Sequence, residues 1–375
     1  MKANRFLCFL FFGLLVLPVC LILLCPSEDF SPTENRMLAT FPTWSAETFF
    51  DGSYAGGIDK FLADRFPFRE PLLRAKSATE LLAGRRQNGN VFFGKDMYQI
   101  KRLEDCDLET LRQNKQAADS IAAHLEKNGK PVTVLYAPRA IDILTDKLPS
   151  GYPQGAAAKP WTVLPRSPLF SVLKEKAARG EAVWYRTDHH WTALGAYYAY
   201  EFLGNSLGYT PLPQNAFRVE TVKEDFLGTS ASASLFPISK PDTIVRYRFE
   251  GDTNFTVTDL STGKECEGFY DDEKLSTSDA YASFLGGNFA HLRITQNGTV
   301  DRPLLLVIKD SYANCLVPFL ARHFDIEMLD TRYIRGASYQ MLDEITAAPG
   351  YAGALLLWNA ETLCSDAGLF PFLPE

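Results

Sequence analysis

The sequence predicts an α/β fold in which helices cover both faces of a parallel sheet. Four apolar runs are too short for helices and are rich in β-branched residues or leucine, which is typical of buried strands. These runs span residues 132–137, 304–308, 326–329 and 354–358. A segment with helical spacing precedes the first run, at residues 107–127, and others separate the runs, at residues 192–207, 313–323 and 339–347. Buried strands that alternate with helices indicate this fold class, whose sites lie beyond the carboxyl ends of the strands.

The chain divides into three regions, at residues 1–26, 27–86 and 87–375. The first contains an apolar segment. The second is rich in turn and cap residues, which predicts a stalk or strap. The third is the main domain, and it begins with a predicted strand at residues 91–94. Within it, alternating segments and turn signals between about residues 211 and 300 predict a β-rich insertion.

The N-terminus predicts an uncleaved membrane signal-anchor. Residues 6–25 are apolar apart from Gly13, Pro18 and three cysteines, and Lys2 and Arg5 precede them. At about 1.5 Å per residue this run matches a bilayer core of about 30 Å, and the positive charges hold the N-terminus in the cytoplasm. The rest of the chain is then extracytoplasmic. A cleaved signal peptide is the alternative, although it normally has a shorter apolar core and small residues at its end.

Composition excludes some partners. The formal net charge is −7, the pI is about 5.4, and no basic stripe with interleaved aromatic residues occurs. Nucleic acid is therefore not an expected partner.

Four of the seven cysteines follow the apolar segment: Cys106, Cys266, Cys315 and Cys364. They show no C-x-x-C spacing. An exported chain could pair them, but four scattered cysteines in a domain of this size do not define a disulfide framework. We expect Cys315 and Cys364 to be buried apolar residues.

The first reactive group is the sequence from Thr187 to Thr192, which contains Asp188, His189, His190 and Trp191. It lies between a predicted strand at residues 182–185 and a predicted helix for which Thr192 is a suitable N-cap. Asp188 and His190 stand two residues apart, so that the carboxylate can accept the Nδ1 proton and fix the tautomer of the imidazole.

The second reactive group is Lys309-Asp310-Ser311-Tyr312, directly after the predicted strand at 304–308. A serine at the carboxyl end of a strand is presented to solvent, and its backbone N–H can face an oxyanion. The position predicts that Ser311 is a nucleophile that His190 activates as a general base.

Both groups also allow other interpretations. An Asp-Ser pair after a strand is a common helix cap, and adjacent histidines occur in solvated loops. Asp188, His189 and His190 could also ligate a metal, but His124, His291 and His323 lie alone and supply no further ligand. We therefore expect neither a metal nor a cofactor.

Together these sequences resemble the DHHW family of bacterial exported proteins and, more distantly, the SGNH-like alginate O-acetyltransferases. The resemblance rests on seven short sequences in a fixed order: Glu34–Leu38 with Phe41-Pro42, Asp64–Arg69, Phe93–Asp96, Ala137–Arg139, Asp188–Trp191, Phe226–Thr229 and Lys309–Tyr312. It implies a flavodoxin-like, SGNH hydrolase-like three-layer core. It also implies that Asp188, His190 and Ser311 form a catalytic triad.

The resemblance implies further site residues. Gly228 and Asn359 stand as candidates for the oxyanion donors that SGNH enzymes possess. Apart from the resemblance, Trp184, Tyr185 and Trp191 lie near the site and suit stacking on sugar rings, although aromatic residues are more commonly buried in a core. Tyr312, Arg332 and Tyr333 are further candidates for substrate binding because they lie near strand ends.

The activity that the resemblance implies is O-acetyl transfer to an exported polysaccharide through an acetyl-serine. Acetyl-CoA would lie on the cytoplasmic side, so a multi-spanning membrane O-acyltransferase is the expected donor partner. Two alternatives remain open from the sequence. A carbohydrate O-acetyl esterase would use the same triad with water as the acceptor, and an inactive glycan-binding envelope protein would keep only the fold.

Overall fold

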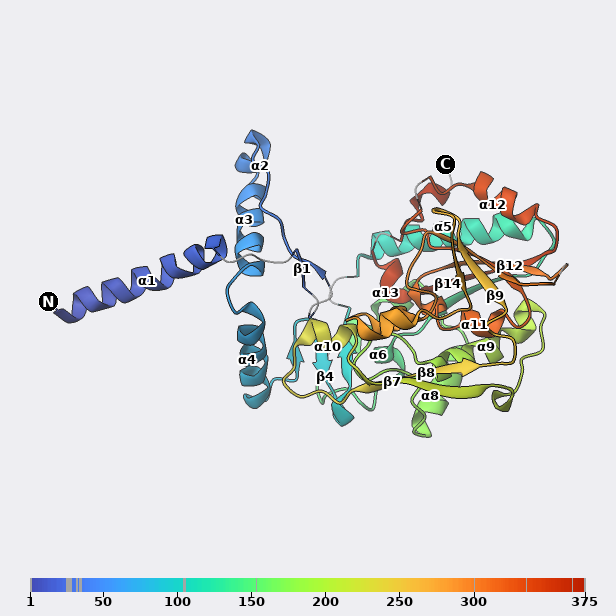
Figure 1. The fold of residues 1–375 in the computed structure, drawn as a ribbon, viewed down its shortest axis with the longest axis horizontal. Coiled ribbons are helices and arrows are strands. Elements are labelled where there is room, and N and C mark those ends of the chain that lie inside the picture. Colours follow the sequence, from blue (N-terminus) through green and yellow to red (C-terminus); the bar gives the residue numbers. More distant parts are fainter. Residues whose placement is uncertain are drawn as a thin grey trace. The chain divides into compact units, whose positions relative to one another are not determined.

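The computed structural model describes residues 2–24, 29–31, 33, 36–103, 106–152, 154–299, 301–334, 336–365 and 367–373. Two compact units make up the chain (Figure 1). The smaller unit comprises residues 1–88 and 232–238, and the larger comprises residues 89–231 and 239–375. Cys25, Glu34 and Asn35, which belong to the predicted anchor and to the first family motif, lie outside the described residues.

The smaller unit consists mainly of helices. Its elements are α1 (Lys2–Leu24), β1 (Phe30–Ser31), β2 (Arg36–Met37), α2 (Ala46–Phe50), α3 (Ser53–Asp64), α4 (Arg69–Leu82) and β3 (Gln87–Asn88). A bidentate ion pair joins two of the family motifs, because the Arg36 guanidinium donates to both carboxylate oxygens of Asp64, at 2.8 and 2.5 Å. In the described part of the chain, no helix combines the length and the apolar character that crossing a membrane requires.

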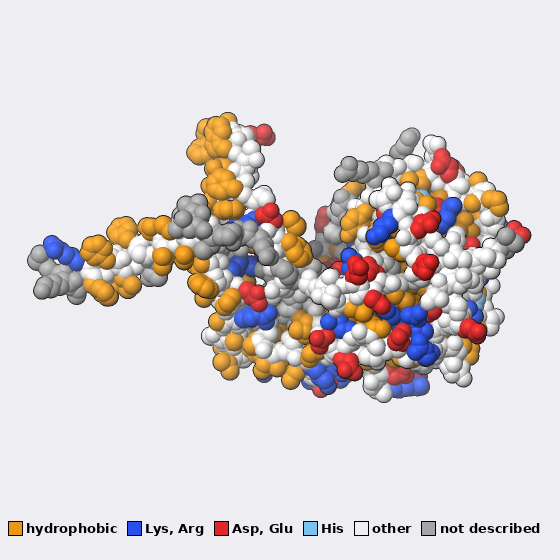
Figure 2. All heavy atoms as spheres, in the orientation of Figure 1, with side chains coloured by type: hydrophobic (Ala, Val, Ile, Leu, Met, Phe, Trp, Pro, Cys, Tyr) orange, Lys and Arg blue, Asp and Glu red, His pale blue; other side chains and the backbone are white. Residues whose placement is uncertain are grey.

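The helices of the smaller unit expose much apolar surface. Figure 2 shows hydrophobic side chains gathered over α2 and α3. Phe49 and Phe50 of α2 are 58% and 85% exposed. Over the larger unit the visible face instead mixes acidic and basic side chains.

A seven-stranded sheet forms the centre of the larger unit, in the order β10-β9-β11-β13-β12-β14-β6. The last four strands are parallel: β13 (Asp325–Leu329), β12 (Leu304–Lys309), β14 (Tyr351–Asn359) and β6 (Val132–Ala137). All four coincide with predicted strands. A separate hairpin pairs β4 (Val91–Phe93) with β5 (Gln99–Lys101), and β4 was also predicted.

Helices cover both faces of this sheet, as predicted. Alternate residues of β12 face opposite layers: Leu306 packs against one core and Leu305 against the other. The helices on the Leu306 face are α5 (Leu108–Glu126) and α12 (Tyr339–Thr346), and those on the Leu305 face are α8 (Leu169–Ala178) and α9 (Ala193–Leu207). Figure 1 shows α5 with α12 and α8 with α9 on their separate sides.

Short elements complete the larger unit. The helices are α6 (Ala140–Ile143), α7 (Gln154–Ala158), α11 (Val317–Leu320) and α13 (Ala360–Leu363), and α10 (Thr229–Ser234) begins in it. The 3-10 turns are η1 (Lys95–Met97), η2 (Lys159–Thr162), η3 (Gln214–Ala216), η4 (Asp272–Ser276), η5 (Ala280–Ser283), η6 (Ser311–Ala313) and η7 (Phe370–Phe372).

The β-rich region between residues 211 and 300 is only partly an insertion. β7 (Arg218–Phe226) and β8 (Asp242–Arg248) form a sheet of their own. By contrast, β9 (Phe255–Asp259), β10 (Lys264–Glu267) and β11 (His291–Gln296) extend the central sheet as antiparallel strands. The sheet is therefore mixed, which corrects the prediction of a parallel sheet. The buried Glu327 of β13 fixes the junction, because it binds His291 and Arg293 of β11.

Two predicted elements are wrong. The helix expected at residues 313–323 is broken into η6, a turn and the four-residue α11. Pro318 lies at the start of α11, where it has no N–H to donate back to the preceding turn. The strand expected at residues 182–185 is reduced to a single bridge between Trp184 and Trp191.

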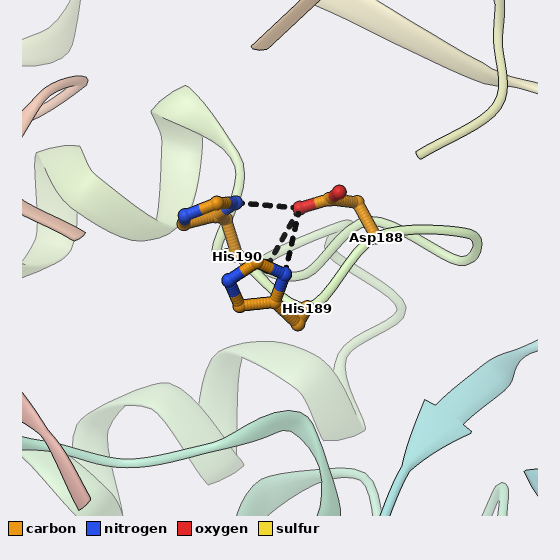
Figure 3. A group of neighbouring side chains, drawn as sticks. All are labelled: Asp188, His189 and His190. Carbon is orange, nitrogen blue, oxygen red and sulfur yellow. Dashed lines mark hydrogen bonds and ion pairs between the residues drawn. The ribbon is translucent and has the colours of Figure 1, made fainter. Parts of the chain in front are cut away.

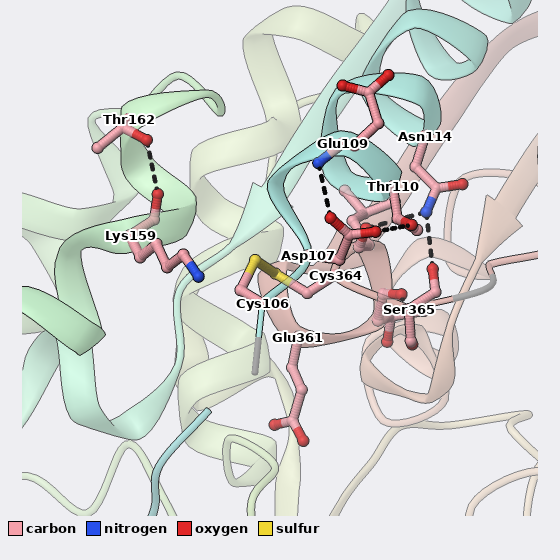
Figure 4. Close-up of a disulfide and its surroundings, with 12 residues drawn as sticks. Cys106, Asp107, Glu109, Thr110, Asn114, Lys159, Thr162, Glu361, Cys364 and Ser365 are labelled. Atoms are coloured by element: carbon pink, nitrogen blue, oxygen red, sulfur yellow. Dashed lines mark hydrogen bonds between the residues drawn. A yellow bond between two sulfur atoms is a disulfide. The ribbon is translucent and has the colours of Figure 1, made fainter. Parts of the chain in front are cut away.

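A disulfide joins Cys106 to Cys364 across a sequence separation of 258 residues (Figure 4). Cys364 is buried as predicted, but it is disulfide-bonded and not simply an apolar core residue, whereas Cys315 is free and buried as predicted. Beside the disulfide, the Asn114 amide donates to the carbonyls of Leu363 and Ser365 at 2.9 and 2.7 Å. The segment that follows β14 is thus fastened to the start of α5.

Candidate active site

The structure brings Asp188, His190 and Ser311 together in one hydrogen-bonded chain. His190 Nδ1 lies 2.6 Å from Asp188 Oδ1, and His190 Nε2 lies 2.8 Å from Ser311 Oγ. A carboxylate can only accept, so Nδ1 carries the proton and Nε2 is left to accept from the serine hydroxyl. Asp188 and His190 are buried, and Ser311 is partly exposed. This geometry suits a serine nucleophile with a histidine base.

Hydrogen bonds at both ends hold the loop that carries Asp188 and His190. The side chain of Thr192 accepts from the Gly195 N–H and begins α9. At the other end, the Asp242 carboxylate accepts from the N–H groups of Arg186 and Thr187, both at 2.8 Å. The loop is therefore fixed on both sides of the histidines, as a catalytic mount requires.

The second oxygen of Asp188 is held by the start of α10. Oδ2 accepts from the Thr229 N–H at 2.8 Å and from the Thr229 hydroxyl at 3.0 Å. Burial alone would raise the pKa of Asp188, but the neighbouring imidazoles of His190 and His189 outweigh it and lower the pKa well below its ordinary value. Asp188 is thus a buried carboxylate that stays ionised.

Gly228 makes room for the Asp188 side chain and does not offer its N–H to an oxyanion. Its N–H donates to the Thr187 hydroxyl at 3.1 Å, so this donor is occupied. A Cβ added at Gly228 would lie 2.3 Å from Asp188 Oδ2. The expectation that Gly228 supplies an oxyanion donor is therefore corrected: glycine is required here because Asp188 packs directly against its backbone.

Asp310 holds the turn that presents Ser311. Its Oδ1 accepts from the Tyr312 N–H at 2.9 Å and caps η6. Its Oδ2 accepts from the Asn359 N–H at 2.7 Å and from the Thr362 hydroxyl at 2.8 Å. Asp310 therefore ties the carboxyl end of β12 to that of β14, which brings Ser311 beside Asn359.

Lys309 lies beneath this turn and is almost completely buried. Its ammonium donates to Asn314 Oδ1 at 2.8 Å and lies 3.5 Å from Asp330 Oδ2. Burial lowers the pKa of Lys309 from its ordinary value, although Asp330 opposes this shift. The same Asp330 carboxylate binds Arg332 through Nε at 2.8 Å and Nη2 at 2.7 Å. Lys309 therefore belongs to a buried polar network that orients Arg332.

A pocket of about 210 Å³ opens beside Ser311. The residues that line it are mostly polar: Lys101, His189, Ser311, Tyr312, Arg332, Asn359, Glu361, Thr362 and Ser365. Asn359 is 3% exposed, and its Oδ1 accepts from the Glu361 N–H at 2.8 Å, which fixes the orientation of the amide. Its Nδ2 is buried and has no hydrogen-bond partner among the residues that the structure describes. A free donor therefore lies in the wall of this pocket.

The candidates for substrate binding lie in three different environments. Trp191 is fully buried and its Nε1 donates to the Tyr312 carbonyl at 3.0 Å, so it belongs to the core, as do Trp184 and Tyr185. Tyr312 and Arg332 line the pocket, although the Tyr312 hydroxyl donates to the His189 carbonyl. Tyr333 is exposed and packs on the guanidinium of Arg332.

Tyr281 in η5 is a site residue that the sequence did not reveal. Its ring lies parallel on that of His190, and its hydroxyl donates to the Ser311 carbonyl at 3.1 Å. It thus contacts two members of the triad. The only sequence signal was an aromatic residue in an irregular segment, which carries no periodicity to interpret.

Asp188, His189 and His190 also form a cluster of potential metal ligands, with donor atoms within 4.8 Å of one another (Figure 3). The hydrogen bonds already described occupy the facing atoms of Asp188 and both nitrogens of His190. His189 Nδ1 lies 2.6 Å from the Thr229 hydroxyl. A metal bound among them would have to displace these bonds.

The fold and the site define the class of protein. A family model described as the SGNH hydrolase-like domain of the acetyltransferase AlgX matches residues 91–238. The larger unit accordingly has an SGNH hydrolase-like α/β fold. The model of the DHHW protein family matches residues 34–114 and 168–329, so the chain belongs to the DHHW family.

Solved structures share this fold. The crystal structure of a DHHW family protein from Eubacterium siraeum is 22% identical, covers 76% of this chain and 95% of its own, and gives a TM-score of 0.58. PatB1 of Bacillus cereus, solved with a sulfonyl adduct, is 19% identical, with 76% and 100% of the two chains covered and a TM-score of 0.58. No curated protein matches the chain.

Proposed function

We propose that this protein is an O-acetyltransferase that modifies an extracytoplasmic polysaccharide through an acetyl-Ser311 intermediate. The observation that carries the proposal is the unbroken hydrogen-bond chain from Asp188 through His190 to Ser311. The partial match to the AlgX acetyltransferase model supports the choice of acyl group, because it includes Asp188 and His190.

In the first half of the proposed reaction, Ser311 Oγ attacks the carbonyl carbon of an acetyl donor. His190 Nε2 takes the hydroxyl proton, and the buried Asp188 carboxylate stabilises the resulting imidazolium. When the tetrahedral intermediate collapses, the leaving group departs with the proton of His190, and acetyl-Ser311 remains. The proton transfer from Ser311 uses two atoms that already lie within hydrogen-bond distance, His190 Nε2 and Ser311 Oγ.

Two donors are available for the negative charge on the tetrahedral oxygen. Asn359 Nδ2 is buried beside Ser311 without a partner in the described structure. Ser311 begins η6, so its own N–H has no carbonyl one turn earlier to which it could donate. A preorganised donor of this kind lowers the barrier by about 3–4 kcal/mol.

In the second half, a sugar hydroxyl attacks the acetyl carbon and gives its proton to His190, and Ser311 Oγ leaves as the hydroxyl. Water as the attacking group would make the protein an esterase. The mostly polar walls of the pocket, with Lys101, Arg332 and Glu361, favour an acceptor with many hydroxyl groups.

The proposal places the larger unit outside the cytoplasm. The Cys106–Cys364 disulfide supports this location, because disulfides persist in oxidising compartments. The signal-anchor expected at residues 6–25 belongs to the same proposal and is tested by membrane fractionation. The donor would then come from a multi-spanning membrane O-acyltransferase, since cytoplasmic acetyl-CoA cannot reach Ser311.

The first experiment measures p-nitrophenol release from p-nitrophenyl acetate. The wild-type protein should show a burst that Ser311→Ala abolishes, and mass spectrometry should place an acetyl group on Ser311. Ser276→Ala, an exposed serine that bonds only to a nearby carbonyl, is the matched control and should retain the burst. Equal turnover by the wild type and Ser311→Ala would remove the catalytic assignment and favour a glycan-binding protein.

A second experiment adds an oligosaccharide acceptor and follows its acetylation by mass spectrometry. Acetylated sugar indicates a transferase, and acetate alone indicates an esterase. A parallel assay with EDTA tests the metal alternative, because a metal-dependent hydrolase would lose activity with the chelator and would not depend on Ser311.

A further inference from the structure

Thr229 determines which nitrogen of His189 carries the proton. The Thr229 hydroxyl has one hydrogen and lies 3.0 Å from Asp188 Oδ2, which can only accept. The hydroxyl therefore donates to Asp188 and must accept from His189 Nδ1, which lies 2.6 Å away. Nδ1 also lies 3.8 Å from Asp188 Oδ1, a position that favours a proton over a lone pair. His189 is thus the Nδ1-protonated tautomer.

The other nitrogen of His189 is a bare acceptor. Figure 3 shows it on the side of the ring that points away from Asp188. No hydrogen bond links Nε2 to the described residues, and the side chain is 26% exposed and lines the pocket beside Ser311. Burial, together with the neighbouring His190, lowers the pKa of His189 well below its ordinary value, so the ring is neutral at neutral pH.

Two imidazoles therefore lie side by side at Ser311. The ring centroids of His189 and His190 are 3.8 Å apart. Once Ser311 is acetylated and the leaving group has taken the proton from His190, the Nε2 atoms of both histidines are free to accept a hydrogen bond. A single hydroxyl has only one hydrogen, so it cannot satisfy both. Two neighbouring hydroxyls of one sugar ring can.

We infer that the acceptor is a vicinal diol: one hydroxyl donates to His190 Nε2 and attacks the acetyl group, while its neighbour donates to His189 Nε2. This inference rests on the proposed function and names the acceptor more closely. The attacking oxygen forms the new ester bond, the bond from the acetyl carbon to Ser311 Oγ breaks, and the proton passes through His190 to Ser311. His189 binds and orients the acceptor and gains no proton.

Two isomeric probes isolate this contact. With p-nitrophenyl acetate as donor, trans-cyclohexane-1,2-diol and trans-cyclohexane-1,4-diol are supplied at equal concentration, and both monoacetates are quantified. Each probe has two equivalent hydroxyls, but only the 1,2-isomer can reach both histidines. The wild type should favour it by about two- to tenfold, the range expected for one neutral hydrogen bond.

Variants of His189 test whether this residue binds the second hydroxyl, through the same ratio of 1,2- to 1,4-diol monoacetate. In His189→Asn the amide still donates to Thr229 but has no atom at the Nε2 position, so the ratio should fall to about one. His189→Gln places an amide oxygen near that position and should keep part of the preference. His124→Asn, the same change on α5 at a side chain paired with Asp343, should leave the ratio unchanged.

The outcomes are distinguishable. A wild-type ratio of one, or an unchanged ratio in His189→Asn, overturns the inference, while the Ser311 burst and the monoacetates formed still support acetyl transfer through Ser311. Absence of the burst in the wild type overturns the proposed function itself. If His189→Asn does not fold by circular dichroism, Thr229→Val replaces it. Thr229→Val removes the hydroxyl that fixes the tautomer of His189, so it should also reduce the ratio. An undiminished ratio in Thr229→Val overturns the inference.

Discussion

The phenol ring of Tyr281 lies parallel to the imidazole of His190, with the ring centroids 3.8 Å apart and the planes inclined by 7°. The aromatic face restrains the imidazole and would favour the positive charge that the proposed reaction places on His190. The hydroxyl of the same residue holds the Ser311 carbonyl. Tyr281 thus fixes the base and the nucleophile relative to each other.

Two variants separate the contribution of the Tyr281 ring from that of its hydroxyl. Tyr281→Phe keeps the stacked ring and loses the hydrogen bond, so the rate of Ser311 acetylation should fall by less than about tenfold. Tyr281→Leu loses both, and the rate should fall further while KM for the donor changes little. Stopped-flow release of p-nitrophenol measures the step. Equal rates in the two variants would show that the stacked ring contributes nothing.

The side-chain oxygen and the side-chain nitrogen of Asn359 can be tested separately. In Asn359→Asp a carboxylate oxygen can still cap α13 through the Glu361 N–H, but the Nδ2 donor is replaced by negative charge. We expect kcat to fall by about 10²–10³-fold. The cap is retained, but one carboxylate oxygen is buried without a partner, so the melting temperature should fall modestly. A normal kcat would place the oxyanion elsewhere.

Gly228→Ala should damage both the site and the fold. The new Cβ would overlap with Asp188, which must shift or leave its bonds to Thr229. Overpacking of this kind costs about 1–3 kcal/mol, and the turnover should fall with it. Gly155→Ala is the control, since open space surrounds Gly155. Thermal unfolding and esterase assays of the two variants provide the comparison.

Loss of the disulfide should weaken the pocket wall. Replacement of both Cys106 and Cys364 by serine releases the segment that contains Thr362 and should cost about 2–5 kcal/mol of unfolding free energy. Dithiothreitol should have the same effect on the wild type. Cys266→Ser, at an exposed free cysteine, should change neither stability nor activity. Denaturant titrations that are the same with and without dithiothreitol would contradict the prediction.

His323 should make the fold sensitive to mild acid. Its Nε2 lies 2.8 Å from the Tyr200 hydroxyl, and burial, with Arg322 and Arg302, lowers the pKa of His323 to about 4. The unfolded chain binds this proton near pH 6.5, so the stabilisation is complete above that pH and is lost as the pH falls towards 4. The loss amounts to at most about 3 kcal/mol.

The matched variant for that prediction is His323→Gln, which keeps an acceptor for the Tyr200 hydroxyl and cannot titrate. Its unfolding free energy should vary less between pH 6.5 and 4 than that of the wild type. Urea titrations at a series of pH values measure the difference. Parallel profiles for the two proteins would assign the acid sensitivity to other groups.

The sequence predicted the part of the fold that depends on local pattern. The parallel strands were recognisable because residues such as Leu305 and Leu306 are buried on opposite faces, which leaves a continuous apolar run. The antiparallel β11 has only a short alternation, with Leu292 and Ile294 buried, and it was predicted only as part of a β-rich region. Alternation predicts a strand but not its neighbour in the sheet, which here is β13, and Glu327 of β13 also binds His291 and Arg293.

The site divides in the same way. Asp188, His190 and Ser311 stood out because two loops next to strands carried reactive side chains. Gly228 was assigned to the wrong task, since a sequence does not reveal that Asp188 packs against its backbone. The pairing of Cys106 with Cys364 was equally hidden, because a separation of 258 residues carries no local signal.

The order of the chain gives the hydrogen bond between His190 and Ser311 one more consequence. Ser311 follows His190 by 121 residues, and the bonds that hold its turn come from Asn359 and Thr362, later still. During synthesis, the turn that carries Ser311 can therefore form its bonds to Asn359 and Thr362 only after residue 362 has been added. The arrangement of Asp188, His190 and Ser311 gains its full support only when nearly the whole chain is present.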